Sequence, residues 1–211
     1  MNKRTATAAL LGGLIWAGTA SAERPNVMLQ GFGAVQAQSN AAGGTSTDGN
    51  LVGGGLNVIV PITGWIGLRG QLQSLSGDQG PSTARVDTSQ DEVRLAAEFG
   101  IPMGRARLTI SPEFLNTRTE TGNASESAPG GALHLGLRTD HGGRLNGYAR
   151  GGYITLDDQL KTRGVEINAG ISGVIGAGVG LFSEYRMQKF ENDNNNKLDA
   201  GLFRLGLHVQ F

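Results

Sequence analysis

The chain has no cysteine in its 211 residues. Disulfide bonds, zinc–thiolate sites and cysteine nucleophiles are therefore excluded. Aromatic residues are scarce, at 6% of the sequence. Beyond the N-terminal segment, no stretch approaches the run of about eighteen apolar residues that a membrane-spanning helix needs. The sequence predicts neither a disulfide-bonded scaffold nor a helical membrane protein.

An excess of charge is also lacking, because 18 Lys and Arg residues face 18 Asp and Glu residues. Nucleic-acid binding is usually accompanied by a clear basic excess. A balanced chain gives no electrostatic reason to expect a nucleic-acid partner, and we predict none.

The N-terminus has the order of a secretory signal peptide. Lys3 and Arg4 precede the apolar run 8–17, and the small residues Ala20-Ser21-Ala22 follow it. The apolar run is too short for a transmembrane anchor. We therefore predict a cleaved signal peptide at residues 1–22 and one exported domain at residues 23–211. Cleavage removes two basic residues and leaves a net charge of −2.

Glycine is abundant, with 35 residues, and it recurs inside apolar segments rather than in a linker. Glycine weakens a strand unless bulky side chains approach it closely or the sheet has to bend. A small β-barrel requires both. The glycine distribution therefore favours a curved, closed sheet.

Apolar and polar residues alternate with a period of two along most of the chain, which indicates β-strands with two different faces. Most of these segments are about ten residues long, the length that a tilted strand needs to cross the hydrocarbon core. We predict ten strands, with eight as the alternative, at residues 27–38, 51–60, 65–75, 92–101, 106–116, 132–139, 145–155, 165–175, 181–190 and 202–211.

The connections between these segments alternate in length. Short turns are expected near residues 61–64, 102–105, 140–143 and 176–179, and long polar loops at 39–50, 76–91, 117–131, 156–164 and 191–201. Outer-membrane barrels have short periplasmic turns and longer extracellular loops. The alternation therefore favours an all-β, antiparallel, up-and-down transmembrane β-barrel over a soluble sandwich.

The parity of the side chains assigns one face of each strand to lipid and the other to the lumen. In 92–101, for example, Val93, Leu95 and Phe99 alternate with Arg94 and Glu98. Arginine on the lipid face would cost about 2–4 kcal/mol near the midplane, so the charged face has to be the inner one. The predicted lumen network consists of Arg69, Arg94, Glu98, Arg107, Glu113, Arg138, Arg150, Glu166, Glu184, Arg186 and Arg204. Polar filling is expected from Gln30, Gln71, Gln73, His134, Asn168 and His208.

The last residues complete this picture. Leu205, Leu207, Val209 and Phe211 share one parity, and the strand ends on the aromatic residue. The ending with Arg204, Gly206, Val209 and Phe211 resembles the signal that the outer-membrane barrel assembly machinery recognises. Together with the segment 180–186, it resembles the small OmpA/OmpX-like outer-membrane barrels. The resemblance implies an outer-membrane location, with no peptidoglycan-binding domain after the barrel.

Two functions remain open for such a barrel. The first is a non-enzymatic structural or surface role through the extracellular loops, with the lumen filled by arginine and glutamate. The second is a narrow porin for ions or small solutes that slightly favours anions, because arginine is in excess. Small barrels have interiors that side chains are able to fill, which favours the first function.

Catalytic and metal chemistry receive little support. Of the three histidines, His134 is expected near Ser111, Glu113 or Ser127, but no motif accompanies such a group. His141 falls in a predicted turn. Residues 191–199 place oxygen ligands at alternate positions, as calcium loops do, but Lys197 interrupts them and no glutamate closes the site. We predict no enzyme, no cofactor and no metal.

The expected surroundings follow from the membrane location. The partners are outer-membrane lipid, lipopolysaccharide and the barrel assembly machinery, and the protein is expected to be a monomer. Trp65 and Phe211 are predicted near the periplasmic interface, and Phe114, Tyr153 and Phe190 near the outer one. Tyr148 and Tyr153 differ in parity, so either one of them faces inward or a bulge at 151–152 shifts the register.

Overall fold

The computed structural model describes residues 27–42, 45–81, 84–139, 145–158 and 161–211. The predicted signal peptide and His141 lie outside these ranges. Within them, no helix has the length and apolar character to cross a lipid bilayer. The strands are β1 (Met28–Ala42), β2 (Thr45–Pro61), β3 (Ile66–Gly80), β4 (Val86–Met103), β5 (Ala106–Thr121), β6 (Ala124–Thr139), β7 (Leu145–Leu156), β8 (Arg163–Gly176), β9 (Val179–Glu191) and β10 (Lys197–Gln210).

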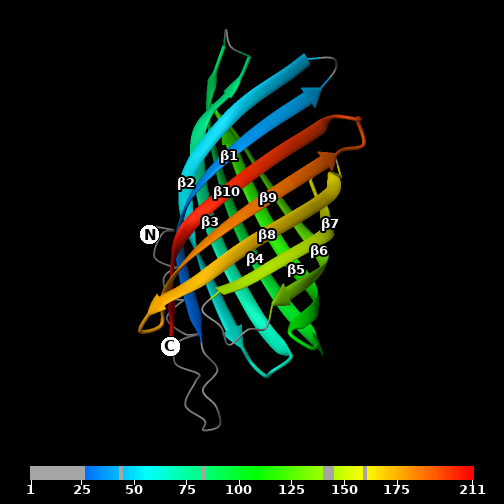
Figure 1. The fold of residues 1–211 in the computed structure, drawn as a ribbon. Coiled ribbons are helices and arrows are strands. Elements are labelled where there is room, and N and C mark those ends of the chain that lie inside the picture. Colours follow the sequence, from blue (N-terminus) through cyan, green and yellow to red (C-terminus); the bar gives the residue numbers. More distant parts are fainter. Residues whose placement is uncertain (1–26, 43–44, 82–83, 140–144, 159–160) are drawn as a thin grey trace, which may run out of the picture.

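These strands form one closed antiparallel barrel in which each strand pairs with its neighbours in sequence (Figure 1). The ring closes between β1 and β10, with a register from Met28 opposite Gln210 to Ala41 opposite Lys197. The prediction of ten strands is confirmed, and the alternative of eight is excluded. A single register shift is present in the described pairings, between Val174 and Gly176 of β8.

The strands extend well beyond the predicted apolar segments at one end of the barrel. β5 continues to Thr121 and β6 begins at Ala124, so most of the predicted loop 117–131 is paired sheet. The same holds for the ends of β2, β3 and β4 at this end. The predictions of long polar loops at 39–50, 76–91 and 117–131 are therefore wrong, whereas connections at 157–162 and 192–196 lie within the predicted loops 156–164 and 191–201. Backbone hydrogen bonds continue the ladder where the side chains are polar on both faces and the alternation disappears.

The other end of the barrel has three of the four short connections that were predicted, and the fourth, near 140–143, lies outside the described residues. Residues 62–65 join β2 to β3, Gly104 and Arg105 join β4 to β5, and Ala177 and Gly178 join β8 to β9. Positive φ angles at Gly104, Ala177 and Gly178 are typical of such tight turns. We call this the short-turn end, and the opposite end the hairpin end.

The outer and inner surfaces have opposite character. Large apolar side chains on the outer surface are exposed, among them Leu95, Ile110, Leu135, Ile171 and Leu205. Charged side chains on the inner surface are buried, among them Arg94, Glu113, Glu166, Arg186 and Arg204. Water-soluble proteins show the reverse arrangement. This inversion is what a lipid-facing belt around a polar interior requires.

Glycines on the inner surface make room for large side chains on the neighbouring strands. A β-carbon at Gly152 would overlap the ring of His134, its cross-strand partner. The same relation joins Gly55 to Phe32, Gly136 to Arg150, Gly170 to Tyr148, Gly180 to His208 and Gly206 to Phe182. The abundant glycine therefore serves the close approach that the sequence predicted.

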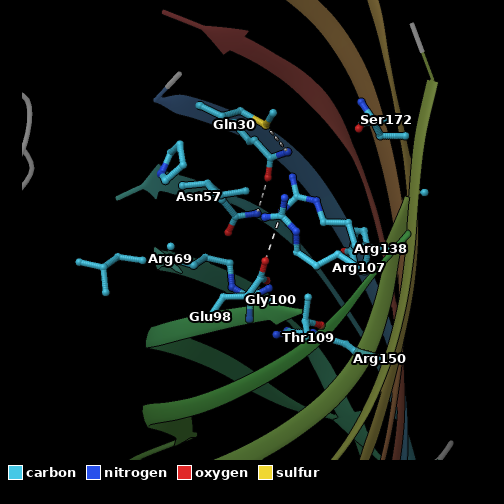
Figure 2. A pocket seen from close by; sticks show the side chains of 18 of the residues that line it. Gln30, Asn57, Arg69, Glu98, Gly100, Arg107, Thr109, Arg138, Arg150 and Ser172 are labelled. Atoms are coloured by element: carbon cyan, nitrogen blue, oxygen red, sulfur yellow. Dashed lines mark hydrogen bonds and ion pairs between the residues drawn. The ribbon is translucent and has the colours of Figure 1, made fainter. Parts of the chain in front are cut away.

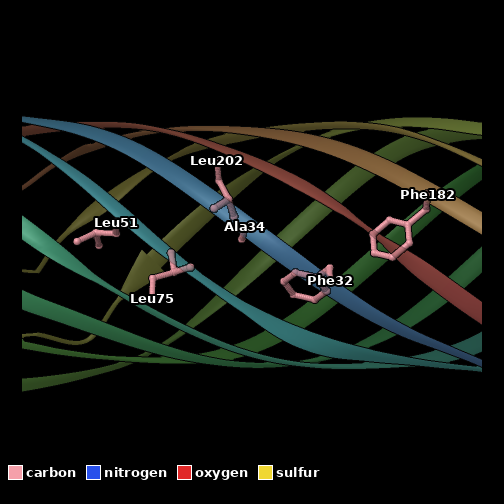
Figure 3. Close-up of a cluster of buried hydrophobic side chains, with 6 residues drawn as sticks. All are labelled: Phe32, Ala34, Leu51, Leu75, Phe182 and Leu202. Carbon is pink, nitrogen blue, oxygen red and sulfur yellow. The ribbon is translucent and has the colours of Figure 1, made fainter.

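Apolar side chains also enter the lumen, which the sequence analysis did not predict. One cluster contains Phe32, Ala34, Leu51, Leu75, Phe182 and Leu202 (Figure 3). A second contains Leu115, Ile154 and Phe190. Phe190 was predicted in the outer aromatic belt, but it is buried on the inner surface, with the same parity as Glu184 and Arg186. The prediction for Phe190 is wrong, because its parity decides its face.

The larger apolar residues lie mainly toward the hairpin end. On its own strand, each of Leu75, Leu115, Ile154 and Leu202 lies on the hairpin side of a lumen-facing residue of the polar interior, namely Gln73, Glu113, Arg150 and Arg204. Most of the buried apolar side chains therefore lie on the hairpin side of the charged network, whereas Phe182 lies on its short-turn side and lines the cavity there.

Candidate functional site

Arg94 of β4 is the centre of the buried charges. Its guanidinium contacts Glu92 at 2.7 Å, Glu113 of β5 at 2.9 Å and Glu166 of β8 at 2.9 Å. β4 and β8 are not neighbours in the barrel. The contact between Arg94 and Glu166 therefore crosses the lumen.

Arg186 of β9 makes a second crossing. Its Nη1 contacts Glu92 of β4 at 2.8 Å, and its Nη2 donates to the side-chain oxygen of Gln71 at 3.1 Å. β9 and β4 lie on opposite sides of the strand ring. Two independent contacts thus join opposite walls of the barrel at one level.

Arg204 of β10 links the closing strand to the same group. It contacts Glu184 at 2.7 Å and donates to the side chains of Gln71 and Gln73 on β3. Its guanidinium also lies over the ring of Phe32, 4.8 Å from the centroid, in cation–π geometry. The hydroxyl of Tyr148 donates to Glu184 from the other side.

The carboxylate of Glu166 has the most partners. Besides Arg94, it accepts hydrogen bonds from Asn168 at 2.6 Å and Gln188 at 2.7 Å, and Nε2 of His134 lies 3.2 Å away. Its side chain is completely buried. A buried carboxylate is tolerated only when its oxygens are paired in this way. The interior is thus a connected and largely satisfied network.

A cavity of about 930 Å³ lies between this network and the short-turn end. Residues of the turn at 61–67 line its mouth, and Gln71, Arg150 and Glu184 line its inner end. Figure 2 shows Arg69, Arg107 and Arg138 around this cavity, together with Glu98. Arg138 pairs with Glu98 at 3.4 Å, and both side chains are partly exposed. The lumen is thus hollow at the short-turn end and filled in its middle.

The candidate catalytic residues do not form an accessible site. His134 lies opposite Ser111 in the register of β5 and β6, and Glu113 is 3.9 Å from its Nδ1. Ser127 instead donates to Asn116 near the hairpin end. Both His134 and Ser111 are almost fully buried within the network. Their position is that of packed polar side chains.

The segment 191–199 forms a tight asparagine turn. The side-chain oxygen of Asn192 accepts hydrogen bonds from the backbone amides of Asn194 at 3.0 Å and Asn196 at 3.1 Å. This oxygen is therefore used by the chain itself. In the described parts of the chain, no group of three or more His, Cys, Asp or Glu residues is arranged to hold a metal ion.

No protein-family model matches the sequence, and no curated protein matches it. Solved structures do resemble it. The translocator domain of the autotransporter NalP from Neisseria meningitidis aligns over 99% of this chain and 97% of its own, at 12% identity and a TM-score of 0.51. The chain has the fold of an outer-membrane β-barrel.

Two further solved structures are similar at lower scores. Neisserial surface protein A aligns over 87% of this chain and 97% of its own, with 13% identity and a TM-score of 0.44. The outer-membrane protein OprG from Pseudomonas aeruginosa aligns over 89% and 96%, with 13% identity and a TM-score of 0.42.

The predicted lumen residues of this outer-membrane barrel separate into two groups. Eight of them join the connected network: Arg69, Arg94, Glu113, Arg150, Glu166, Glu184, Arg186 and Arg204. The other three, Glu98, Arg107 and Arg138, line the cavity. Arg69, Arg150 and Glu184 belong to both groups, because they line the cavity and also form ion pairs in the network.

Sequence reasoning missed three members of the network. Glu92 has the parity of Arg94 but lies at the first residue of its predicted strand. Tyr148 has the parity of Arg150, and the described register of β7 shows no bulge, so Tyr148 faces inward and Tyr153 outward. Gln188 has the parity of Arg186. The parity rule alone was sufficient to find all three.

The residues of the predicted assembly signal have different surroundings. Arg204 is buried in the network, and Gly206 faces the ring of Phe182. Val209 lies opposite Leu29 in the closing pair. Phe211 is exposed, and its backbone amide donates to the carbonyl oxygen of Val27 at 3.0 Å.

Proposed function

We propose that the protein is a non-enzymatic integral protein of the outer membrane of a Gram-negative bacterium, and that its lumen does not conduct. The supporting observation is the pair of contacts that cross the lumen, Arg94 to Glu166 at 2.9 Å and Arg186 to Glu92 at 2.8 Å. The apolar cluster with Leu115, Ile154 and Phe190 lies beyond them toward the hairpin end. Ions would have to displace the charged network and this cluster to pass.

The proposed orientation follows from the two ends of the barrel. Short turns of outer-membrane barrels face the periplasm, and longer connections face outward. The hairpin end, where β2 to β6 extend as paired strands, would therefore project from the cell surface. In this proposal the protein acts through these rigid hairpins, as a monomer surrounded by outer-membrane lipid and lipopolysaccharide.

Planar-bilayer recording of the refolded mature chain tests the closed lumen. We expect no discrete current steps at moderate voltage. The variant with Arg94→Ser and Arg186→Ser removes both crossings and should raise the frequency of transient openings. Stable, anion-selective steps from the unmodified protein would overturn the proposal.

Such steps would favour the second candidate, a narrow porin with a slight preference for anions. The observation in its favour is the cavity at the short-turn end, whose lining contains Arg69, Arg107, Arg138 and Arg150 beside Glu98 and Glu184. Arginine around a pore attracts anions and repels cations. In that case Arg107→Glu should reduce the anion preference of the current.

We also propose that Arg204, Gly206, Val209 and Phe211 direct assembly, as the resemblance of the sequence implies. Phe211 is a suitable position for the test, because its side chain is exposed and a substitution there removes few packing contacts. Phe211→Ser should lower the amount of barrel in the outer membrane of cells, while refolding in detergent is unchanged. Equal amounts of both proteins in cells would contradict this role.

A further inference from the structure

Strand β6 has an edge without a neighbouring strand at the hairpin end. β5 and β6 are paired up to Thr121 opposite Ala124, but the pairing of β6 with β7 begins only at Gly130, opposite Leu156. Residues 124–129 of β6 therefore extend beyond the end of β7 by about 20 Å, the rise of six extended residues. In the described pairings, this stretch has a partner strand on one side only.

The direction of the backbone groups along this edge follows from Pro129. Its carbonyl oxygen accepts a hydrogen bond from the amide of Asp157, which directly follows β7, so the carbonyl faces the β7 side. In an antiparallel strand, residues at alternate positions direct both backbone groups to the same side. The N–H and C=O groups of Ser125 and Ser127 therefore point to the edge without a neighbour. Proline is tolerated at position 129 because the N–H that it lacks would lie on this same side.

The side chains along this edge leave the backbone accessible. The hydroxyl of Ser127 donates to the side-chain oxygen of Asn116, and the hydroxyl of Ser125 accepts from Nε of Arg118, both toward β5. Ser125, Glu126 and Ser127 are exposed. The backbone groups of both serines are therefore open to a further strand. Sheet edges of this kind bind extended peptides by adding them as a strand.

The hairpins around the edge carry a net negative charge. Segments 76–91 and 117–129 contain five acidic and two basic residues, a net charge of −3, namely Asp78, Asp87, Asp91, Glu120 and Glu126 against Arg85 and Arg118. Arg118 pairs with Glu120 at 2.6 Å on the outer face. Glu126 lies on the inner face, opposite Thr119, and forms no ion pair with another described residue. A basic residue on an added strand would supply one.

We propose that the open edge of β6 binds an extended segment of another protein as an antiparallel strand, with a lysine or arginine opposite Glu126. The two residues beside this cation would exchange backbone hydrogen bonds with Ser125 and Ser127. The next residues would lie opposite Ala124 and Ala128, whose small side chains leave room for apolar ones. A second copy of this chain is disfavoured. Pairing Ser125 of one copy with Ser127 of the other would place two Glu126 side chains opposite each other.

The probe is a cyclic β-hairpin peptide whose outer strand reads Val-Thr-Lys-Thr-Val, because a preformed strand loses little entropy on binding. Fluorescence anisotropy of the labelled peptide measures its affinity for the refolded mature chain in detergent. We expect saturable binding, together with slower hydrogen exchange at the amides of Ser125 and Ser127 in the complex. The control peptide carries N-methyl groups on the two threonine amides. It keeps every side chain but loses the backbone donors, and it should not bind.

The protein variants separate the backbone from the charge. Ser127→Pro removes one N–H at the edge, leaves the ladder to β5 intact, and should weaken binding about tenfold or more. Glu126→Lys should weaken binding of the lysine peptide about fivefold or more and should favour a peptide with glutamate in place of the lysine. The matched control is Glu120→Lys, because Glu120 lies on the outer face of β5 beside Arg118. Its affinity should stay within about twofold.

Three results would overturn the proposal. One is the absence of saturable binding, and another is equal binding of the N-methylated peptide. The third is hydrogen exchange at Ser125 and Ser127 that slows with protein concentration alone, since a second copy would then occupy the edge. Because Glu126→Lys is expected to gain affinity for the glutamate peptide, incomplete folding of Ser127→Pro does not decide the outcome. Heat-dependent gel migration verifies the folded fraction of every variant before titration.

The inference deepens the proposed surface role, and only the location of the partner outside the cell rests on the proposed orientation. The same hairpin peptide, fused to a folded fluorescent protein that is too large to cross the outer membrane, should label intact cells that produce the barrel. Binding in detergent without labelling of cells would contradict the orientation and support the edge. A conducting barrel that binds the peptide would contradict the closed lumen alone.

Discussion

The ring of His134 lies over Gly152, its partner across β6 and β7, in the space that a β-carbon at position 152 would fill. Gly151, the next residue, faces outward, and a β-carbon there would have only ordinary contact, with the carbonyl oxygen of Glu166 at 3.8 Å. Two adjacent glycines of one strand thus have different roles. One accommodates a buried ring, and the other faces lipid.

Gly152→Ala should therefore destabilise the barrel, whereas Gly151→Ala should not. Overfilling a packed interior typically costs about 1–3 kcal/mol. The added methyl group at position 151 enters the lipid-facing surface and should change the free energy of unfolding by less than about 1 kcal/mol. Urea titration of the folded protein in detergent measures both. Equal effects at the two positions would show that His134 does not occupy this space.

Glu166→Gln tests the buried network. Removing one charge of a buried ion pair leaves its partners uncompensated and costs about 3–5 kcal/mol. Glutamine keeps the size of the side chain, so the loss reports on charge rather than packing. The control is Glu120→Gln, in the exposed pair with Arg118, where the loss should stay below about 1 kcal/mol. If the network did not stabilise the barrel, the two substitutions would lower the free energy of unfolding by similar, small amounts.

Leu135→Arg tests whether the outer surface faces lipid. Leu135 is 57% exposed on the outer surface and lies opposite Ile110 and Gly151. In water, this substitution at an exposed position would be almost neutral, but near a bilayer midplane it costs about 2–4 kcal/mol. Refolding into lipid vesicles with urea titration measures the difference.

Val165→Arg is the control for that experiment. Val165 is also half exposed on the outer surface, but it lies opposite Lys189, whose side chain is exposed. This level of the barrel already carries a cation on its outside, so an arginine should cost no more than about 1 kcal/mol. A loss at Val165 as large as at Leu135 would contradict the predicted position of the membrane.

Limited trypsin digestion tests the extended hairpins. Arg118 lies in a region predicted as a loop from sequence, but it is paired with Asp91 and Ser127 in the sheet. Lys161 lies in the connection between β7 and β8 with a positive φ of 49°. Trypsin should cleave at Lys161 well before Arg118, because paired strands do not fit a protease active site without opening. Mass spectrometry of the fragments identifies the order, and early cleavage at Arg118 would indicate an irregular loop.

Side-chain parity was sufficient to predict which residues face the lumen. Arg94 and Leu95 are neighbours in sequence, and the period of two places them on opposite surfaces. For Phe190, the prediction gave more weight to its aromatic character than to its parity, and that prediction was wrong. Parity also identified Gln30, His134 and His208 as inward-facing, and all three are buried.

The partners within the lumen were beyond sequence reasoning. Arg94 contacts Glu166 because tilt and stagger bring β4 and β8 to one level, and neither quantity is encoded in the alternation. The strand ends were missed for a related reason. Thr119 and Glu126 are paired in the ladder although the residues on either side of each of them are polar or charged, so that no apolar residue alternates with them to indicate a strand.

The hydrogen bonds from Arg204 to Gln71 and Gln73 join residues more than 130 positions apart. These hydrogen bonds form only when β10 has paired with β1 and the first half of the barrel has curved around the lumen. An unclosed sheet would expose four arginines to lipid without their carboxylates, at a cost that grows with each strand inserted. Closure of the barrel and formation of the buried ion pairs therefore occur together. Such a barrel should assemble in an all-or-none manner, with the interior charges excluding half-built forms from the membrane.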